Sequence, residues 1–233
     1  MKTINLTVYS FDDLSKDIQK QIIERERWNV MEQCMSDYRS DYQASLDRFE
    51  KLMNISVSQW NVDYSGYGYN VRIDTKIIHE WEYKQGENEI YDCIYLENLS
   101  GKLLVRHLQN HILQELLPRK CYHVFQYIDG KPIGKRRYSK IIKECSCPLT
   151  GYCYDMYLID PILKYLQNPT PTTTYEDLMN ECIESFFNCW HEEYEYWGDN
   201  EDAICERLHQ NQYEDQLYYK NGQVYNGPLE DVA

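Results

Sequence analysis

The sequence predicts an α+β protein with long helices, small antiparallel β-hairpins and an acidic helical C-terminal part. Apolar residues recur every three or four positions in two segments, 31–53 and 178–190, as on the buried face of a helix. Apolar and polar residues alternate on both sides of a glycine loop at 66–68, and Asn221-Gly222 is a strong hairpin signal. The 233 residues, 42% of them apolar and 27% charged, are typical of a globular chain that needs no disulfide or metal to fold.

The first elements are predicted from the alternation typical of a strand and the spacing of three or four typical of a helix. Alternation at 4–8 predicts a strand, and the capping oxygens and early negative charge at 10–17 predict a helix that begins between residues 12 and 16. A second helix of about 26 residues is expected to form a backbone of the core, since its apolar-aromatic stripe advances by three or four. The members of this stripe are Met31, Cys34, Met35, Tyr38, Tyr42, Leu46, Phe49, Leu52 and Met53.

The next segments alternate between strand and helix signals. Residues 55–57 and 71–75 predict a hairpin, 90–96 a further strand, and 100–117 a helix that Pro118 stops. The basic segment 119–143 is expected to be a hairpin or an exposed loop. Asp160-Pro161 is expected to open a helix that runs to about Gln167, with the proline at its first position.

The C-terminal part begins after a proline-containing linker. Thr174 is expected to cap a helix over 175–197, Asp199 or Asn200 a short helix through Leu208, and the chain to end in a two-stranded ribbon at Asn221-Gly222. We therefore divide the chain into three successive parts. These are an N-terminal α+β part with the long helix (1–118), a basic segment with a cysteine-containing turn (119–168), and an acidic helical part that ends in a β-hairpin (169–233).

Charge is distributed unevenly along the chain. The formal net charge is −14, which argues against general binding to nucleic acid or to an anionic membrane. Residues 1–144 are neutral overall, so the excess lies in 145–233, and 176–215 holds 13 acids against one base. Segment 119–143 has eight bases and one acid. It is either a phosphate-binding arm with tyrosines available for stacking or a counter-charge for the acidic part.

The nine cysteines do not indicate a disulfide framework. Their number is odd, and the first residues lack the apolar core of a signal peptide, so we expect a reducing, intracellular setting. Apolar runs are interrupted far short of the roughly 20 residues that cross a bilayer, so no membrane partner is expected.

Two motifs carry a resemblance to a known family. They are Tyr-Ser-Phe-Asp-Asp-Leu-Ser at 9–15 and Glu-Cys-x-Cys-Pro-Leu-Thr-Gly-x-Cys-Tyr-Asp at 144–155, and the acidic helix with its Asn-Gly hairpin accompanies them. The chain resembles a family of accessory proteins from phages and prophages of Gram-positive bacteria, many of which are labelled antitoxins of toxin–antitoxin systems. The resemblance implies a small phage protein that acts on host machinery in the bacterial cytoplasm, and it implies no catalytic residue.

The leading candidate site is the acidic helical region. Dense carboxylates on consecutive helices approach the linear charge of a nucleic acid, and interleaved aromatic rings would anchor a partner. The alternative is a solvated face that only keeps the protein soluble. The candidate contact residues are Glu181, Glu184, Glu192, Glu193, Glu195, Tyr194, Tyr196, Trp197, Asp199, Glu201 and Asp202, with Trp190 as a further anchor.

Metal and enzyme signals are weak. Cys145, Cys147 and Cys153, with Cys121 and His123 upstream, do not match the paired spacing of structural zinc sites, so we expect a turn with reduced thiols. His107 and His111 share a helix face, but no Glu follows the first histidine as in a metalloprotease. Gly66-x-Gly68 lacks the context of a dinucleotide fold, and no cofactor is expected.

The sequence therefore favours a non-enzymatic, phage-encoded inhibitor. It would bind a bacterial defence or nucleic-acid-processing protein, such as a CRISPR effector, through a surface that mimics nucleic acid. One alternative is an antitoxin that neutralises a toxin or binds its operator. Another is a metal-binding or enzymatic phage protein that uses the cysteine and histidine groups.

Overall fold

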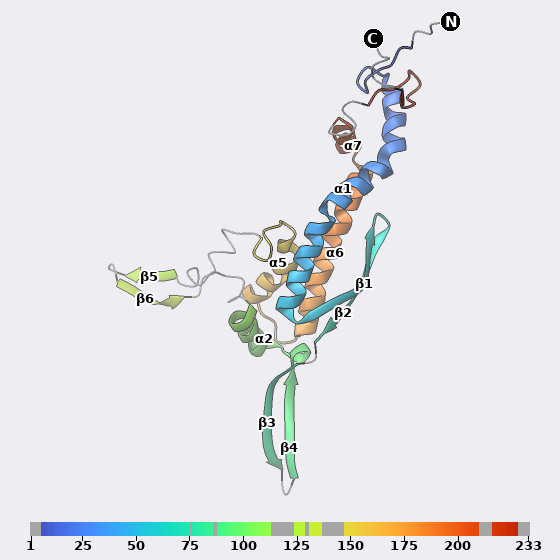
Figure 1. Cartoon of the computed structure of the whole chain (residues 1–233). Coiled ribbons are helices and arrows are strands. Elements are labelled where there is room, and N and C mark those ends of the chain that lie inside the picture. The colour runs from blue at the N-terminus through green and yellow to red at the C-terminus, as the bar shows by residue number, and fades with distance from the viewer. Residues whose placement is uncertain are drawn as a thin grey trace. The chain divides into compact units, whose positions relative to one another are not determined.

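The computed structural model describes residues 6–74, 76–85, 88–112, 124–128, 131–136, 147–209 and 216–227. The fold is α+β, as the sequence predicts (Figure 1). Its helices are α1 (Lys16–Met53), α2 (Gly101–His107), which continues as a π-helical turn over Leu108–Ile112, α5 (Asp155–Gln167), α6 (Tyr175–Asp199) and α7 (Glu201–Leu208). A 3-10 turn covers Leu96–Asn98.

The strands of the described residues form three antiparallel hairpins. They pair β1 (Ile55–Asp63) with β2 (Gly66–Ile73), β3 (Ile77–Gln85) with β4 (Asn88–Tyr95), and β5 (Val124–Ile128) with β6 (Lys131–Arg136). The β1–β2 and β4 predictions are confirmed, and the basic segment does contain a hairpin. β3 is an element that the sequence analysis missed. The strand expected at 4–8 is reduced, in the described residues, to an isolated bridge between Tyr9 and Tyr218.

The chain forms two compact units. Unit 1 comprises Met1–Tyr38 and Glu192–Ala233, and unit 2 comprises Arg39–His191. α1 is one helix of 38 residues, whereas the sequence analysis expected two. Its buried positions recur after one or two helical turns from Gln19 to Met53, so they stay on one face of a single helix. α1 and α6 each contribute residues to both units.

Unit 1 has a core that joins residues distant in sequence. Phe11, Leu14 and Ile22 pack with residues of α7 and the C-terminal segment in one buried cluster. The cluster members are Phe11, Leu14, Ile22, Ile23, Val30, Cys34, Ile204, Leu208 and Tyr218. The expected terminal ribbon is a turn closed by a single bridge between Tyr218 and Val224.

Unit 2 is built around stacked aromatic rings. Tyr42 is fully buried between Tyr154 and Trp190, with ring centroids 3.6 and 4.5 Å away. The hairpin β1–β2 packs on α6 through Trp60, whose ring centroid lies 5.2 Å from that of Trp190. These contacts cover the buried face of α6 that the sequence predicts, because Leu178, Cys182, Phe186, Cys189 and Trp190 are all buried.

One helix start differs from the prediction. α5 begins at Asp155, not at Asp160-Pro161, so Pro161 lies inside the helix and is buried. An interior proline costs roughly 3 kcal/mol. Burial of the neighbouring Leu158, Ile159 and Ile162 offsets that cost, at about 1.5–3 kcal/mol for each large apolar side chain. Of the helices in the described part of the chain, none combines the length and apolar character that crossing a bilayer requires.

Candidate functional site

Negative charge is concentrated in unit 1. Its segments contain 18 acidic and 7 basic residues, for a net charge of −11, whereas the segments of unit 2 contain 20 and 17, for a net charge of −3. The sequence analysis placed the excess in 145–233. The fold instead joins the acidic end of α6 and α7 with the acids of residues 12–37, and thereby forms one strongly negative unit.

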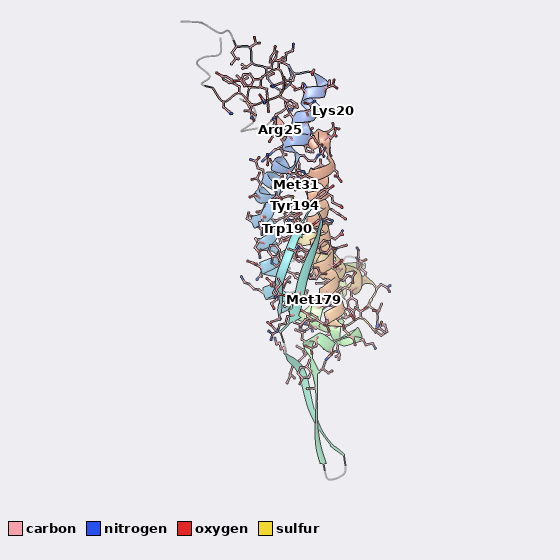
Figure 2. All side chains as sticks on the ribbon, turned by 90° about the vertical axis from the view of Figure 1, so that its right-hand side faces the viewer. Lys20, Arg25, Met31, Met179, Trp190 and Tyr194 are labelled. Atoms are coloured by element: carbon pink, nitrogen blue, oxygen red, sulfur yellow. The ribbon has the colours of Figure 1, made fainter. Side chains whose placement is uncertain are left out.

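The C-terminal portion of α6 presents an acidic stripe. Glu192, Glu195 and Asp199 are three and four residues apart, so they share one face of the helix, and all three are exposed. Tyr194 lies on the opposite side of the helix, by the turn of about 100° per residue, and is buried, as is Met31 of α1; both residues are labelled in Figure 2. Burial of that opposite face sets the orientation of the stripe.

α7 adds carboxylates beside the end of α6. The Asn200 side chain caps the helix by accepting a hydrogen bond from the backbone N–H of Ala203 at 3.0 Å. Glu201 and Asp202 occupy the first turn, where the helix dipole favours negative charge, and both are exposed. Asn200 therefore starts the helix at the position that presents these two acids to solvent.

Arginines of unit 1 hold these helices together. Arg27 of α1 donates to the backbone carbonyl of Gly198 and to Glu24, and its guanidinium lies 3.6 Å from Glu201. Arg207 of α7 forms an ion pair with Asp37 at 2.7 Å. These contacts neutralise part of the surface, and they fix α7 against α1. With 18 acids against 7 bases, the unit keeps a large negative excess.

The predicted aromatic anchors differ in their exposure to solvent. Tyr196 is half-exposed, at 50% of its maximal accessible surface. Trp190 and Tyr194 are buried in the cores that α6 contacts, so neither ring is presented at the surface (Figure 2). Trp197 is half-buried, and its indole N–H is buried without a partner among the described residues. Burial, followed by the neighbouring charge of Glu192, raises the pKa of Glu193.

Glu181 and Glu184 belong to unit 2. Glu181 is exposed. Glu184 accepts hydrogen bonds from the hydroxyl groups of Tyr67 and Tyr69 on β2, the first at 2.8 Å. Burial and this bond to Glu184 raise the pKa of Tyr69. The carboxylate of Glu184 therefore helps to fix the hairpin on α6.

Trp28 is a surface aromatic residue that the sequence analysis missed. It is half-exposed, at 49%, and lies on α1 with Glu24 and Glu32 four residues before and after it. Residues four apart are neighbours on a helix surface. The spacing of Glu24, Trp28 and Glu32 is therefore a sequence signal for an exposed aromatic residue between two acids, although the stronger periodic signal of this helix is its buried apolar stripe.

The cysteine motif forms a loop around a buried carboxylate. Asp155 is fully buried and accepts hydrogen bonds from the backbone N–H groups of Leu149, Thr150 and Gly151 at 2.7–3.2 Å. Its second oxygen accepts from the Thr150 hydroxyl at 2.9 Å, and that hydroxyl oxygen lies 3.2 Å from the Ser45 hydroxyl of α1. These contacts assign the motif a structural role at the start of α5.

The metal candidates do not come together in the described part of the chain. Cys147 is half-buried and Cys153 exposed, while Cys145, Cys121 and His123 lie outside the described residues. No group of three metal-ligating side chains is found among the described residues. The ring of His107 packs edge-on against Tyr175, with centroids 5.7 Å apart, and the side chain of His111 is not described.

A cysteine, a histidine and an aspartate do meet in unit 1. The His209 ring contacts Asp12 through Nε2 at 2.9 Å, and its Nδ1 lies 2.6 Å from the Cys205 carbonyl oxygen and 3.8 Å from the Cys205 Sγ. Both ring nitrogens lie within hydrogen-bonding distance of an oxygen acceptor, and the hydrogen bond to Asp12 raises the pKa of His209. Burial raises the pKa of the Cys205 thiol. This burial opposes formation of a nucleophilic thiolate at Cys205.

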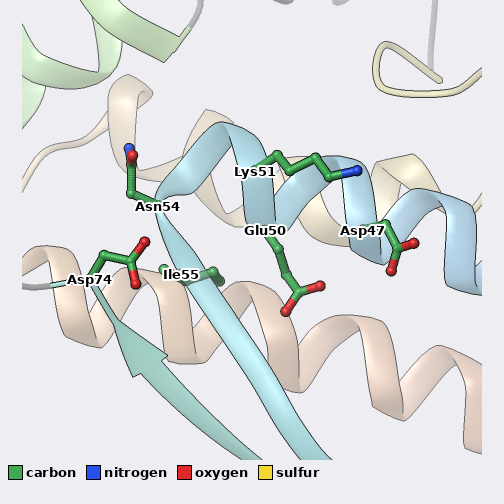
Figure 3. A pocket seen from close by; sticks show the side chains of 6 residues that line it. All are labelled: Asp47, Glu50, Lys51, Asn54, Ile55 and Asp74. Carbon is green, nitrogen blue, oxygen red and sulfur yellow. The ribbon is translucent and has the colours of Figure 1, made fainter.

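A hollow of about 340 Å³ lies where α1 passes into β1 (Figure 3). Asp47, Glu50, Lys51, Asn54, Ile55 and Asp74 line it. Glu50 accepts a hydrogen bond from the backbone N–H of Val57, and burial raises its pKa. Asn54 ends α1 in the left-handed conformation, with φ of 53°. The hollow thus accompanies the helix-to-strand turn and has no convergent catalytic groups.

Comparison of the chain with protein-family models, with curated proteins and with solved structures finds no match. The charge and geometry of unit 1 are therefore the features from which a function is inferred.

Proposed function

We propose that this protein is a non-enzymatic inhibitor that binds a bacterial defence or nucleic-acid-processing protein, with the acidic surface of unit 1 in place of the nucleic acid. The observation that carries the proposal is the net charge of −11 in the segments of one compact unit, together with exposed carboxylates on α6 and α7. Such a surface suits a cationic cleft, which it would meet by fast, electrostatically steered association.

The spacing of the carboxylates supports mimicry over simple solvation. Glu192 and Asp199 are seven steps apart along the helix, about 10 Å at 1.5 Å per residue, and Glu195 lies between them. Their spacing is of the same order as the 3.4 Å per phosphate along one strand of a duplex. The buried opposite face of α6 holds these charges on a firm surface, so little order remains to be acquired on binding.

A binding activity is favoured here over the alternative that uses the cysteine and histidine groups. Burial raises the pKa of the Cys205 thiol, which opposes formation of a nucleophilic thiolate beside His209. We therefore place the activity in binding. The antitoxin alternative differs in its target, a toxin or an operator, and the experiment below separates the two.

The test is capture and inhibition with matched charge variants. The full chain is used to capture its host partner, and the nucleic-acid binding of that purified partner is measured with and without the chain. We expect competitive inhibition that is lost near 0.5 M salt, where the Debye length falls to a few Å. Glu192→Lys with Glu195→Lys should abolish it, while Asp47→Lys with Asp74→Lys, two exposed acids of unit 2, should retain it at the same net charge.

Three results would contradict the proposal. One is equal loss of inhibition in both double variants, which would indicate a general effect of net charge. Another is capture that is indifferent to salt. The third is a captured toxin with no nucleic-acid cleft, which would favour the antitoxin alternative. Circular dichroism of each variant checks that its fold is intact.

A further inference from the structure

Two large aromatic rings are half-exposed among the carboxylates of unit 1. Trp28 on α1 is 49% exposed and Tyr196 on α6 is 50% exposed. Phe11 and Tyr218 of this unit are instead buried in its core. An exposed indole and phenol on a strongly charged surface are the kind of groups that anchor a protein partner.

Carboxylates flank each ring on its own helix. Glu32 follows Trp28 by four residues, while Glu192 precedes Tyr196 by four and Asp199 follows it by three. These spacings make each carboxylate a surface neighbour of its ring. All three acids are exposed. Each ring is therefore bordered by negative charge at the distance of one helical turn.

The two rings lie near the same contact between α1 and α6. Arg27, adjacent to Trp28 in sequence, donates a hydrogen bond to the carbonyl of Gly198, two residues beyond Tyr196. Along the helix axes, Trp28 and Tyr196 are therefore both within about one helical turn of this contact. Each ring, with the carboxylates beside it on its own helix, can contact one arginine of a partner.

We propose that this surface, defined by Trp28, Tyr196, Glu32, Glu192 and Asp199, selects arginine-rich protein segments over lysine-rich ones. The inference rests on the proposed function and specifies the chemistry of the partner. A guanidinium is planar and weakly hydrated, so it stacks on an aromatic face while its N–H fork bonds a carboxylate beside it. An ammonium is a compact, strongly hydrated charge. The carboxylates attract it, but it does not stack on the aromatic rings as a planar guanidinium does.

Unit 2 contains an internal example of the same contact. The Arg39 guanidinium carbon lies 5.7 Å from the centroid of the Trp60 ring. The carboxylates around Trp28 and Tyr196 repel phosphates, so these rings are not a stacking platform for nucleic acid. The charge complementarity instead favours an arginine-lined protein groove, which is the kind of surface that normally contacts phosphates.

The test compares two probes of equal charge. Fluorescent 12-residue oligo-arginine and oligo-lysine peptides are titrated with the full chain, and binding is followed by anisotropy at 0.1 M salt. We expect oligo-arginine to bind about 5- to 20-fold more tightly, since each exposed cation–π contact contributes about 2- to 5-fold. Trp28→Ala with Tyr196→Ala should remove this preference and leave the affinity for oligo-lysine unchanged.

A matched variant controls for the loss of an exposed ring. Tyr152 is 41% exposed but belongs to unit 2, outside the proposed surface, so Tyr152→Ala should leave the arginine preference intact. Glu32→Gln with Glu192→Gln should weaken the binding of both peptides.

The possible failures are distinguishable. Equal affinity of the wild-type chain for the two peptides, or a preference that survives loss of both rings, overturns this inference and leaves the acidic surface in place. Failure to bind either peptide overturns the proposed function as well. Both ring positions are half-exposed, so the double variant should fold, and its thermal midpoint checks this.

Discussion

Removal of the Asp155 carboxylate should loosen the loop that carries the cysteine motif. In the native protein this buried group accepts three backbone N–H bonds and one hydroxyl bond. Asp155→Ala removes the acceptor of the three backbone N–H groups, while the Thr150 hydroxyl keeps the Ser45 hydroxyl as a possible partner. A hydrogen bond to a charged group contributes about 1.5–3 kcal/mol, and such contributions are not additive. We therefore expect the free energy of unfolding to fall by about 1.5–3 kcal/mol, the contribution of one hydrogen bond to a charged group and not the sum of four.

The Asp155→Asn variant keeps the shape of the side chain and removes its negative charge. The amide oxygen can accept the three backbone bonds, while the amide nitrogen faces the Thr150 hydroxyl, which can rotate to accept. The loss should be smaller, about 1–2 kcal/mol. Urea unfolding provides the measurement for each variant. Hydrogen exchange of 149–167 and of the surrounding α1 segment then shows whether the damage is local to the Asp155 loop.

A loss below about 1 kcal/mol for Asp155→Ala would refute the reasoning. It would mean that the loop finds water for its donors at little cost, and that the motif is not held by this carboxylate. Loss of partner binding with unchanged stability would also contradict it, because the motif would then act directly in recognition.

Two further predictions concern unit 1. The hydrogen bond to Asp12 raises the folded-state pKa of His209. The contact therefore contributes its full stabilisation of the folded protein below the unfolded-state pKa of about 6.5, and this stabilisation is lost as pH rises through the folded-state pKa. The urea midpoint should fall between about pH 6 and 8, and this fall should be smaller in Asp12→Asn; an equal fall in both proteins would refute the linkage. Gly222→Ala should lower the free energy of unfolding by about 1–3 kcal/mol, because φ is +81° and an added Cβ would lie 2.8 Å from Ile18 Cγ2. Asn221→Ala tests the same turn without that clash, and equal losses in the two variants would argue against the steric explanation.

The helices and strands whose buried residues recur at a regular spacing could be predicted from the sequence. The stripe of α6, the hairpin β1–β2 and the Asn200 cap follow from spacing and local chemistry, because each depends on residues within one or two turns. β3 was missed although Ile77, Trp81 and Tyr83 are strand-favouring types, since charged neighbours weaken the apolar alternation. The start of α5 was misplaced because Pro161 is a strong local signal that burial outweighs.

The acidic composition of the candidate surface could be predicted from the sequence, but the residues that form it could be predicted only in part. Acid density at 176–215 is visible in the chain. Which of those groups face solvent depends on packing. Glu184 bonds two tyrosines of β2, and Tyr194 fills a core, although both carry the same sequence signal as Glu195 and Tyr196.

What the sequence determined by itself is therefore the set of local elements and the sign of the charge. Helical periodicity, caps and net charge are properties of neighbouring residues and of composition. The tertiary structure alone decided that residues 12–37 and 192–231 share one negative unit, through contacts such as Arg207 with Asp37, 170 positions apart. It also decided that Trp28 reaches the surface there. The physical reason is that burial and ion pairing depend on which distant segments pack together, and the spacing of residues along one segment does not encode this.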